Sequence, residues 1–121
     1  AKKLSNLIAF VDYNGKQIDG TVEQVGGAPN FELKFQACNW NVIDVPDGND
    51  VVQIWDAIEL AKAERTKPTA IILHTVKGKG WTYAEELDNN HNFKVNAQQA
   101  AEACAEFALQ KQASAGNGEK E

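Results

Sequence analysis

The chain has 121 residues, 43% of them hydrophobic, and a formal net charge of −5 at pH 7. This length fits at most one domain, and this composition is typical of a globular chain and not of a disordered one. The acidic balance argues against a nucleic-acid-binding surface, and no apolar run approaches the roughly 18 residues needed to cross a bilayer. Cys38 and Cys104 fit no metal-binding spacing, so we expect two reduced, mostly buried thiols in a cytoplasmic protein.

The first elements are predicted from apolar patterning and capping residues. Residues 7–13 predict a strand that is apolar on both faces, as in a parallel sheet covered on each side. Residues 14–29 are rich in Gly, Asp, Gln and Pro and predict a long loop, which in a compact domain is usually functional or mobile. Asn30 is suited to cap a short helix over 31–38, and Asn39 to adopt the left-handed conformation that ends it.

A second strand is predicted over 40–45, followed by a turn at 46–49 and a helix over 51–65 that Asn49 or Asp50 caps. Pro68 ends the helical pattern. The apolar residues of this helix repeat on one face, which is either core or interface: Val51, Ile54, Trp55, Ile58 and Ala61.

The last part of the chain predicts a third buried strand over 70–75, a second long loop over 76–94 and an amphipathic helix over 97–109. The order β-α-β-α-β-α predicts an α/β fold, a right-handed, partial doubly wound parallel sheet with flanking helices. We expect residues 1–111 to form this partial domain and residues 112–121 a flexible C-terminal tail. Three strands with apolar faces need more neighbours than the chain supplies, which indicates an obligate partner.

Four segments resemble, in order and spacing, the thiamine diphosphate-binding domain of transketolases. They are residues 4–14, residues 17–20, residues 40–43 with the Asp47-Gly48 turn, and residues 67–80. The stretch Val11-Asp12-Tyr13-Asn14-Gly15 resembles the second half of the family's thiamine diphosphate motif. The Gly-Asp-Gly half, which precedes it in the family, does not occur in this sequence. The resemblance is strongest to the small N-terminal subunits of split transketolases.

The resemblance implies that Asn14 and the backbone carbonyl of Lys16 bind a divalent metal, Mg²⁺ or Ca²⁺, that holds the cofactor diphosphate. Mg²⁺ prefers oxygen ligands in octahedral geometry, often together with phosphates. A neutral amide oxygen adds no charge to a site that already holds a diphosphate and an aspartate. The alternative is that Asn14 is a turn residue whose side chain bonds locally.

The resemblance also implies contacts with the rest of the cofactor. Gly15 would let the backbone approach it closely, and Ile18 would pack near the thiamine rings unless it is a loop residue tucked into the core. Lys77 would lie near the cofactor or a sugar phosphate, with a solvated lysine as the alternative. The stretch Lys77-Gly78-Lys79-Gly80 lacks the spacing of a Walker phosphate loop.

His91 resembles the family histidine that reaches the diphosphate and the reaction centre, which makes it the candidate catalytic residue. A loop histidine can donate to phosphate or shuttle a proton near neutral pH. Asn92 stands where the family has a Gly, so the backbone path differs, and the alternative is a solvated loop residue. His74 is expected to be a hydrogen-bonded strand residue and not a catalyst.

The implied function is part of a transketolase that transfers a two-carbon ketol unit between sugar phosphates, as in the pentose phosphate branch of carbohydrate metabolism. A complementary polypeptide would carry the Gly-Asp-Gly half and the pyrimidine-binding domain, so we expect an oligomer, and an inactive chain on its own. Two alternatives stay open. One is a non-catalytic structural or assembly fragment, and the other is a subunit of another thiamine diphosphate enzyme, such as a deoxyxylulose-phosphate synthase.

Overall fold

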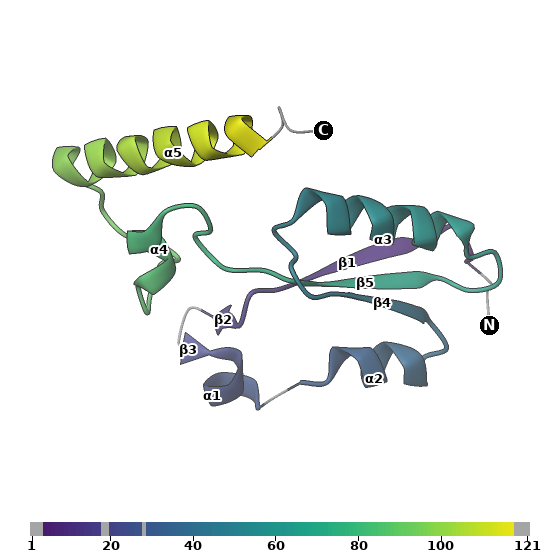
Figure 1. The fold of residues 1–121 in the computed structure, drawn as a ribbon. Coiled ribbons are helices and arrows are strands. Elements are labelled where there is room, and N and C mark those ends of the chain that lie inside the picture. The colour runs from purple at the N-terminus through teal and green to yellow at the C-terminus, as the bar shows by residue number, and fades with distance from the viewer. Residues whose placement is uncertain (1–3, 18–19, 28, 118–121) are drawn as a thin grey trace. The chain divides into compact units, whose positions relative to one another are not determined.

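The computed structural model describes residues 4–17, 20–27 and 29–117, and the chain forms two compact units, residues 1–77 and 78–121. The first unit contains a parallel sheet in the order β1 (Ile8–Tyr13), β5 (Thr69–His74), β4 (Asn41–Val45). Helix α3 (Val51–Ala63) lies on one face of this sheet and α2 (Phe31–Ala37) on the other (Figure 1). The predicted partial doubly wound α/β sheet is therefore confirmed.

Strand β5 is the centre of the first unit. Its residues Thr69–Ile72 are buried, and its neighbours pair with it in register, so that Ile71 lies between Phe10 and Ile43. Ile71 has no exposed surface, and its burial contributes roughly 1.5–3 kcal/mol. The hydrophobic core on the α3 face consists of Val45, Ala57, Ala61 and Ile71.

The predicted helix ends are confirmed at three residues. The Asn30 side chain accepts a hydrogen bond from the Leu33 amide at 2.8 Å, and Asp50 accepts one from the Val52 amide at 2.8 Å. These bonds satisfy amides that a helix leaves unpaired at its N-terminus. The Val52 amide, helped by the Gln53 side chain, also lowers the pKa of the Asp50 carboxyl below its usual value. Asn39 has the expected left-handed backbone, with φ of 62°.

The segment predicted as a loop over 14–29 has more structure than expected. It contains the short antiparallel pair β2 (Lys16–Gln17) and β3 (Gly20–Thr21), followed by α1 (Val22–Gly26). The N-terminus of α1 is fixed by a capping box, in which the Thr21 hydroxyl accepts from the Gln24 amide and the Gln24 side chain accepts from the Thr21 amide.

The second unit contains α4 (Thr82–Glu86) and α5 (Ala97–Asn117). The Glu106 carboxylate of α5 accepts from the Thr82 amide at 3.1 Å, and the Gln110 side chain donates to the Gly80 carbonyl at 2.8 Å. Helix α5 continues past the expected end near residue 109, because alanine and glutamine favour helix there and the first glycine is Gly116. No helix among the described residues is long and apolar enough to span a membrane.

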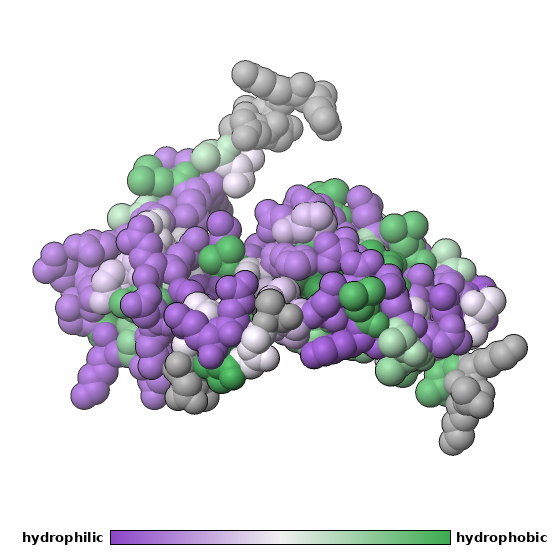
Figure 2. Space-filling model, turned by 90° about the horizontal axis from the view of Figure 1, so that it is seen from below, coloured by the Kyte–Doolittle hydropathy of each residue, from purple (hydrophilic) through white to green (hydrophobic). Residues whose placement is uncertain are grey.

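In α3, Ala57 and the predicted face residue Ala61 are buried, whereas Val51 and Trp55 are 74% and 63% exposed, so the interface alternative stays open for these two residues. The expected burial of the two cysteines is wrong. Cys38 and Cys104 are free, as expected, but both are exposed. Cys38 lies at the end of α2, and Ala103, next to Cys104 in α5, is buried. Hydrophobic side chains thus reach the surface in several places (Figure 2).

A substitution at Gly48 tests how tightly the turn after β4 packs against β5. A Cβ atom at this buried position would lie 2.8 Å from Leu73 Cβ and 2.9 Å from the Leu73 backbone carbon. We therefore expect Gly48→Ala to lower the free energy of unfolding by about 1–3 kcal/mol, measured by urea denaturation. The matched control is Gly26→Ala, which meets nothing within 4 Å and should be close to neutral. Equal stability of the two variants would contradict this packing.

Candidate functional site

The carboxyl ends of the parallel strands meet at one edge of the sheet. The Tyr13 carbonyl at the end of β1 accepts from the Thr75 amide at 3.3 Å, and the His74 carbonyl accepts from the Gly48 amide at 2.8 Å. The Asn49 side chain accepts from the Val76 amide at 2.8 Å, which ties the turn after β4 to the segment after β5. Open α/β sheets bind ligands outside this carboxyl edge, so the residues that follow these strands are the candidate site.

Asn14 follows β1 directly and forms a tight turn. Its side-chain oxygen Oδ1 accepts from the Lys16 amide at 3.0 Å, and the Gly15 carbonyl accepts from the Val22 amide at 3.1 Å. Gly15 has φ of 69°, a left-handed conformation that favours glycine, and it has no neighbour within 4 Å of a Cβ position. The local turn expected as the alternative role of Asn14 is therefore present.

The turn leaves room for the second role of Asn14. A carbonyl oxygen has two lone pairs, and the bond from the Lys16 amide uses one of them. The half-buried Asn14 can thus hold the turn and still offer an oxygen to a hard cation. The described residues contain no group of three His, Cys, Asp or Glu side chains that could hold a metal ion. Asn14 and the Lys16 carbonyl would therefore supply only part of an octahedral set.

The other predicted site residues fall in three places. Lys77 follows β5 in the first unit, which also contains Asn14, Gly15 and Lys16. His91 lies in the second unit. Ile18 lies outside the described residues.

The segment that carries His91 is held within the second unit by contacts on both sides of it. The Asn90 side chain donates to the Ala84 carbonyl of α4 at 2.7 Å. Phe93 lies 5.8 Å from Trp81 and 6.2 Å from Tyr83, between ring centroids. The His91 side chain is exposed, and its amide lies 3.4 Å from Asn89 Oδ1. Helix α4 and this aromatic cluster were not predicted from the sequence, although aromatic residues on both sides of a proposed loop were a signal for them.

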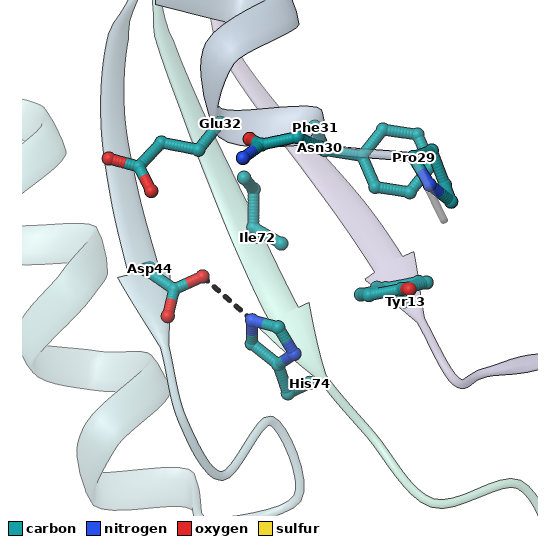
Figure 3. Close-up of a pocket in the computed structure, with 8 residues that line it drawn as sticks. All are labelled: Tyr13, Pro29, Asn30, Phe31, Glu32, Asp44, Ile72 and His74. Atoms are coloured by element: carbon teal, nitrogen blue, oxygen red, sulfur yellow. Dashed lines mark hydrogen bonds and ion pairs between the residues drawn. The ribbon is translucent and has the colours of Figure 1, made fainter. Parts of the chain in front are cut away.

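His74 forms part of a shallow pocket of about 270 Å³ on the α2 side of the sheet (Figure 3). Its Nε2 lies 2.7 Å from Asp44 Oδ1, and its ring packs edge-on against Tyr13 at 5.5 Å between centroids. Tyr13 in turn contacts Phe31 of α2 at 5.2 Å. His74 is therefore the hydrogen-bonded strand histidine that the sequence predicted. The Asp44 and Glu32 carboxylates make the pocket unsuited to a phosphate.

The parallel sheet with helices on both faces (Figure 1) is an α/β fold of the doubly wound class, whose members commonly bind ligands at the carboxyl edge of the sheet. Residues 1–115 match the family described as transketolase, thiamine diphosphate binding domain. The chain belongs to this transketolase family.

Two of the relatives are transketolase subunits. The chain is 38% identical over 106 residues to the 6-deoxy-6-sulfo-D-fructose transketolase subunit SqwG of Clostridium sp. (strain MSTE9), and the match covers 88% of this chain and 38% of SqwG. It is 33% identical over 106 residues to an apulose-4-phosphate transketolase subunit of Phocaeicola vulgatus, covering 88% of this chain and 37% of that relative. The chain thus spans well under half the length of these two relatives.

Solved transketolases share the fold. A transketolase from Pichia stipitis, crystallised with xylulose 5-phosphate, matches 91% of this chain and 19% of its own, with a TM-score of 0.62 and 25% identity. The transketolase of Campylobacter jejuni matches 91% of this chain and 21% of its own, with a TM-score of 0.61 and 25% identity.

Two substitutions at Asn14 test its turn-forming role by itself. In Asn14→Asp the side chain still accepts from the Lys16 amide, so exchange of that amide should stay slow. In Asn14→Ala the acceptor is lost, and exchange should accelerate by roughly five- to tenfold, the equivalent of one net hydrogen bond of about 1 kcal/mol. Amide hydrogen exchange followed by NMR measures both. Unchanged exchange in Asn14→Ala would show that the bond does not hold the turn.

Proposed function

We propose that the chain supplies half of the metal–diphosphate site of a thiamine diphosphate-dependent transketolase, which transfers a two-carbon ketol unit between sugar phosphates. The observation that carries this proposal is the Asn14 turn at the carboxyl end of β1, in a chain whose residues 1–115 match the transketolase cofactor domain. The turn presents a neutral side-chain oxygen where an α/β sheet binds its ligand.

In this proposal, Asn14 Oδ1 and the Lys16 carbonyl would hold Mg²⁺ or Ca²⁺ against the cofactor diphosphate. Both groups are oxygen donors, which suit a hard cation, and they lie two residues apart on one turn. The remaining ligands would come from the diphosphate itself and from the Gly-Asp-Gly half of the motif in a complementary part of the enzyme. When bound, thiamine diphosphate supplies the difficult carbon chemistry through its ylid.

Other residues of the chain are proposed to contact the cofactor, to bind phosphate and to transfer a proton. Gly15, without a side chain, would let the cofactor approach the turn, and Ile18, which lies outside the described residues, would be the residue near the thiamine rings. Lys77 places a positive charge near the diphosphate or a sugar phosphate. His91 donates to phosphate or transfers a proton at the reaction centre. The contacts of Asn90 and Phe93 support this role, because they hold the chain on both sides of His91.

We propose that the active form is an assembly. The chain spans 38% of SqwG and 19% of the Pichia stipitis enzyme, so most of a transketolase must be supplied by other residues. A complementary part that bears the Gly-Asp-Gly half and the pyrimidine-binding domain would complete the site, and the chain alone would be inactive. The two free cysteines support a reducing compartment such as the cytoplasm.

The two histidines of the chain allow a matched test of the proposed chemistry. In the assembled enzyme, we expect His91→Gln to lower kcat/KM for ketol transfer by about 10²-fold or more, the usual contribution of a positioned proton-transfer group. His74→Gln should retain near-normal activity, because His74 bonds Asp44 in the α2-side pocket. A coupled assay of ketol transfer between sugar phosphates measures both. Equal activity of the two variants would show that His91 is not part of the catalytic site. Absence of thiamine-dependent ketol transfer in the wild-type assembly would refute the proposed function.

A further inference from the structure

Helix α4 begins without a cap of its own. The residue before it, Trp81, makes no side-chain hydrogen bond to the first turn, whereas Asn30 caps α2 and Asp50 caps α3. A helix leaves its first amides unpaired, and these amides must find acceptors elsewhere. With five residues, α4 is also too short to be stable by itself. The contacts that hold α4 must therefore come from other parts of the second unit.

The acceptor for the first amide of α4 comes from α5. The two carboxylate oxygens of Glu106 lie 3.1 Å and 3.3 Å from the Thr82 amide nitrogen, and the Thr82 hydroxyl donates to the same carboxylate at 2.5 Å. One turn later on α5, the Gln110 side chain donates to the Gly80 carbonyl at 2.8 Å. A carboxylate at the start of a helix also interacts favourably with the helix dipole. Glu106 thus fixes the start of α4 from a position 24 residues further along the chain.

Helix α4 in turn holds the segment that carries His91. One residue before the histidine, the Asn90 side chain donates to a backbone carbonyl of α4 at 2.7 Å. Two residues after it, Phe93 packs against the two aromatic rings at the start of α4, at 5.8 Å and 6.2 Å between centroids. Both anchors lie within residues 81–84. A shift of this stretch would therefore move the chain on both sides of His91.

We propose that Glu106 is a positioning residue for His91. Glu106 fixes the start of α4, and α4 fixes the backbone before and after the histidine. The inference rests on the proposed function, in which His91 donates to phosphate or transfers a proton at the reaction centre. A group of this kind must lie within hydrogen-bonding reach of its target, so a small displacement of the His91 backbone lowers its contribution steeply.

Substitutions on α5 in the assembled enzyme test this role. In Glu106→Ala both oxygens are lost, and we expect kcat/KM for ketol transfer to fall by about tenfold, with most of the loss in kcat. Glu106→Gln keeps one side-chain oxygen for the Thr82 amide and should stay within about threefold of the wild-type value. The matched control is Glu102→Ala, one turn earlier on α5, where the carboxylate accepts from the Gln98 side chain of the same helix. This control should keep wild-type activity.

A double-mutant cycle separates a role through His91 from general damage. In the His91→Gln background, Glu106→Ala should lower kcat/KM by less than about twofold, because the group that Glu106 positions is already absent. An equal loss in the wild-type and His91→Gln backgrounds would overturn the proposal. It would also be overturned if Glu106→Gln were as damaging as Glu106→Ala, or if Glu102→Ala lost as much activity.

Exchange of the Thr82 amide gives a readout that is independent of activity. Glu106→Ala should accelerate this exchange by about five- to tenfold, and Glu102→Ala should leave it unchanged. Unchanged exchange in Glu106→Ala would show that the carboxylate does not hold α4 and would overturn the proposal. Faster exchange together with wild-type ketol transfer would overturn the positioning role and leave the proposed function standing. Normal activity of His91→Gln would instead overturn the role of His91 and, with it, that of Glu106.

Discussion

The pairing of β5 with a parallel strand on each side is the constraint on which the first unit depends. Its residues Thr69–Ile72 are buried, and its register fixes where β1 and β4 end. The Asn14 turn, the turn at Gly48 and the segment that leads to Lys77 therefore leave the same edge of the sheet. Open α/β sheets bind ligands outside this edge, so the sheet geometry locates the candidate site before any side chain is considered.

The exposed surface of the sheet supports the proposal that the chain works as part of a larger assembly. Helices α2 and α3 pack against β4 and β5, whereas Phe10 of β1 is 52% exposed. The Asn14 turn likewise offers oxygen ligands for only part of a metal site.

The sequence predicts best what depends on neighbouring residues. The caps at Asn30 and Asp50 and the left-handed Asn39 follow from local hydrogen bonding and backbone sterics. The burial of α3 is not decided by the sequence, because helical spacing places Trp55 on one face with Ala61 but does not show whether that face is core or interface. In the site, the Asn14 turn is local and therefore predictable, whereas the anchoring of the His91 segment depends on α4, which the apolar pattern does not reveal.

Native mass spectrometry with Mg²⁺ and thiamine diphosphate tests the central claim most directly, that this chain holds one half of a divided cofactor site. The chain is measured alone and in the assembly isolated from its own source. We expect the chain alone to retain no thiamine diphosphate, and the assembly to retain it only while Mg²⁺ is present. Retention of the cofactor by the chain alone, or an assembly that binds none, would contradict it.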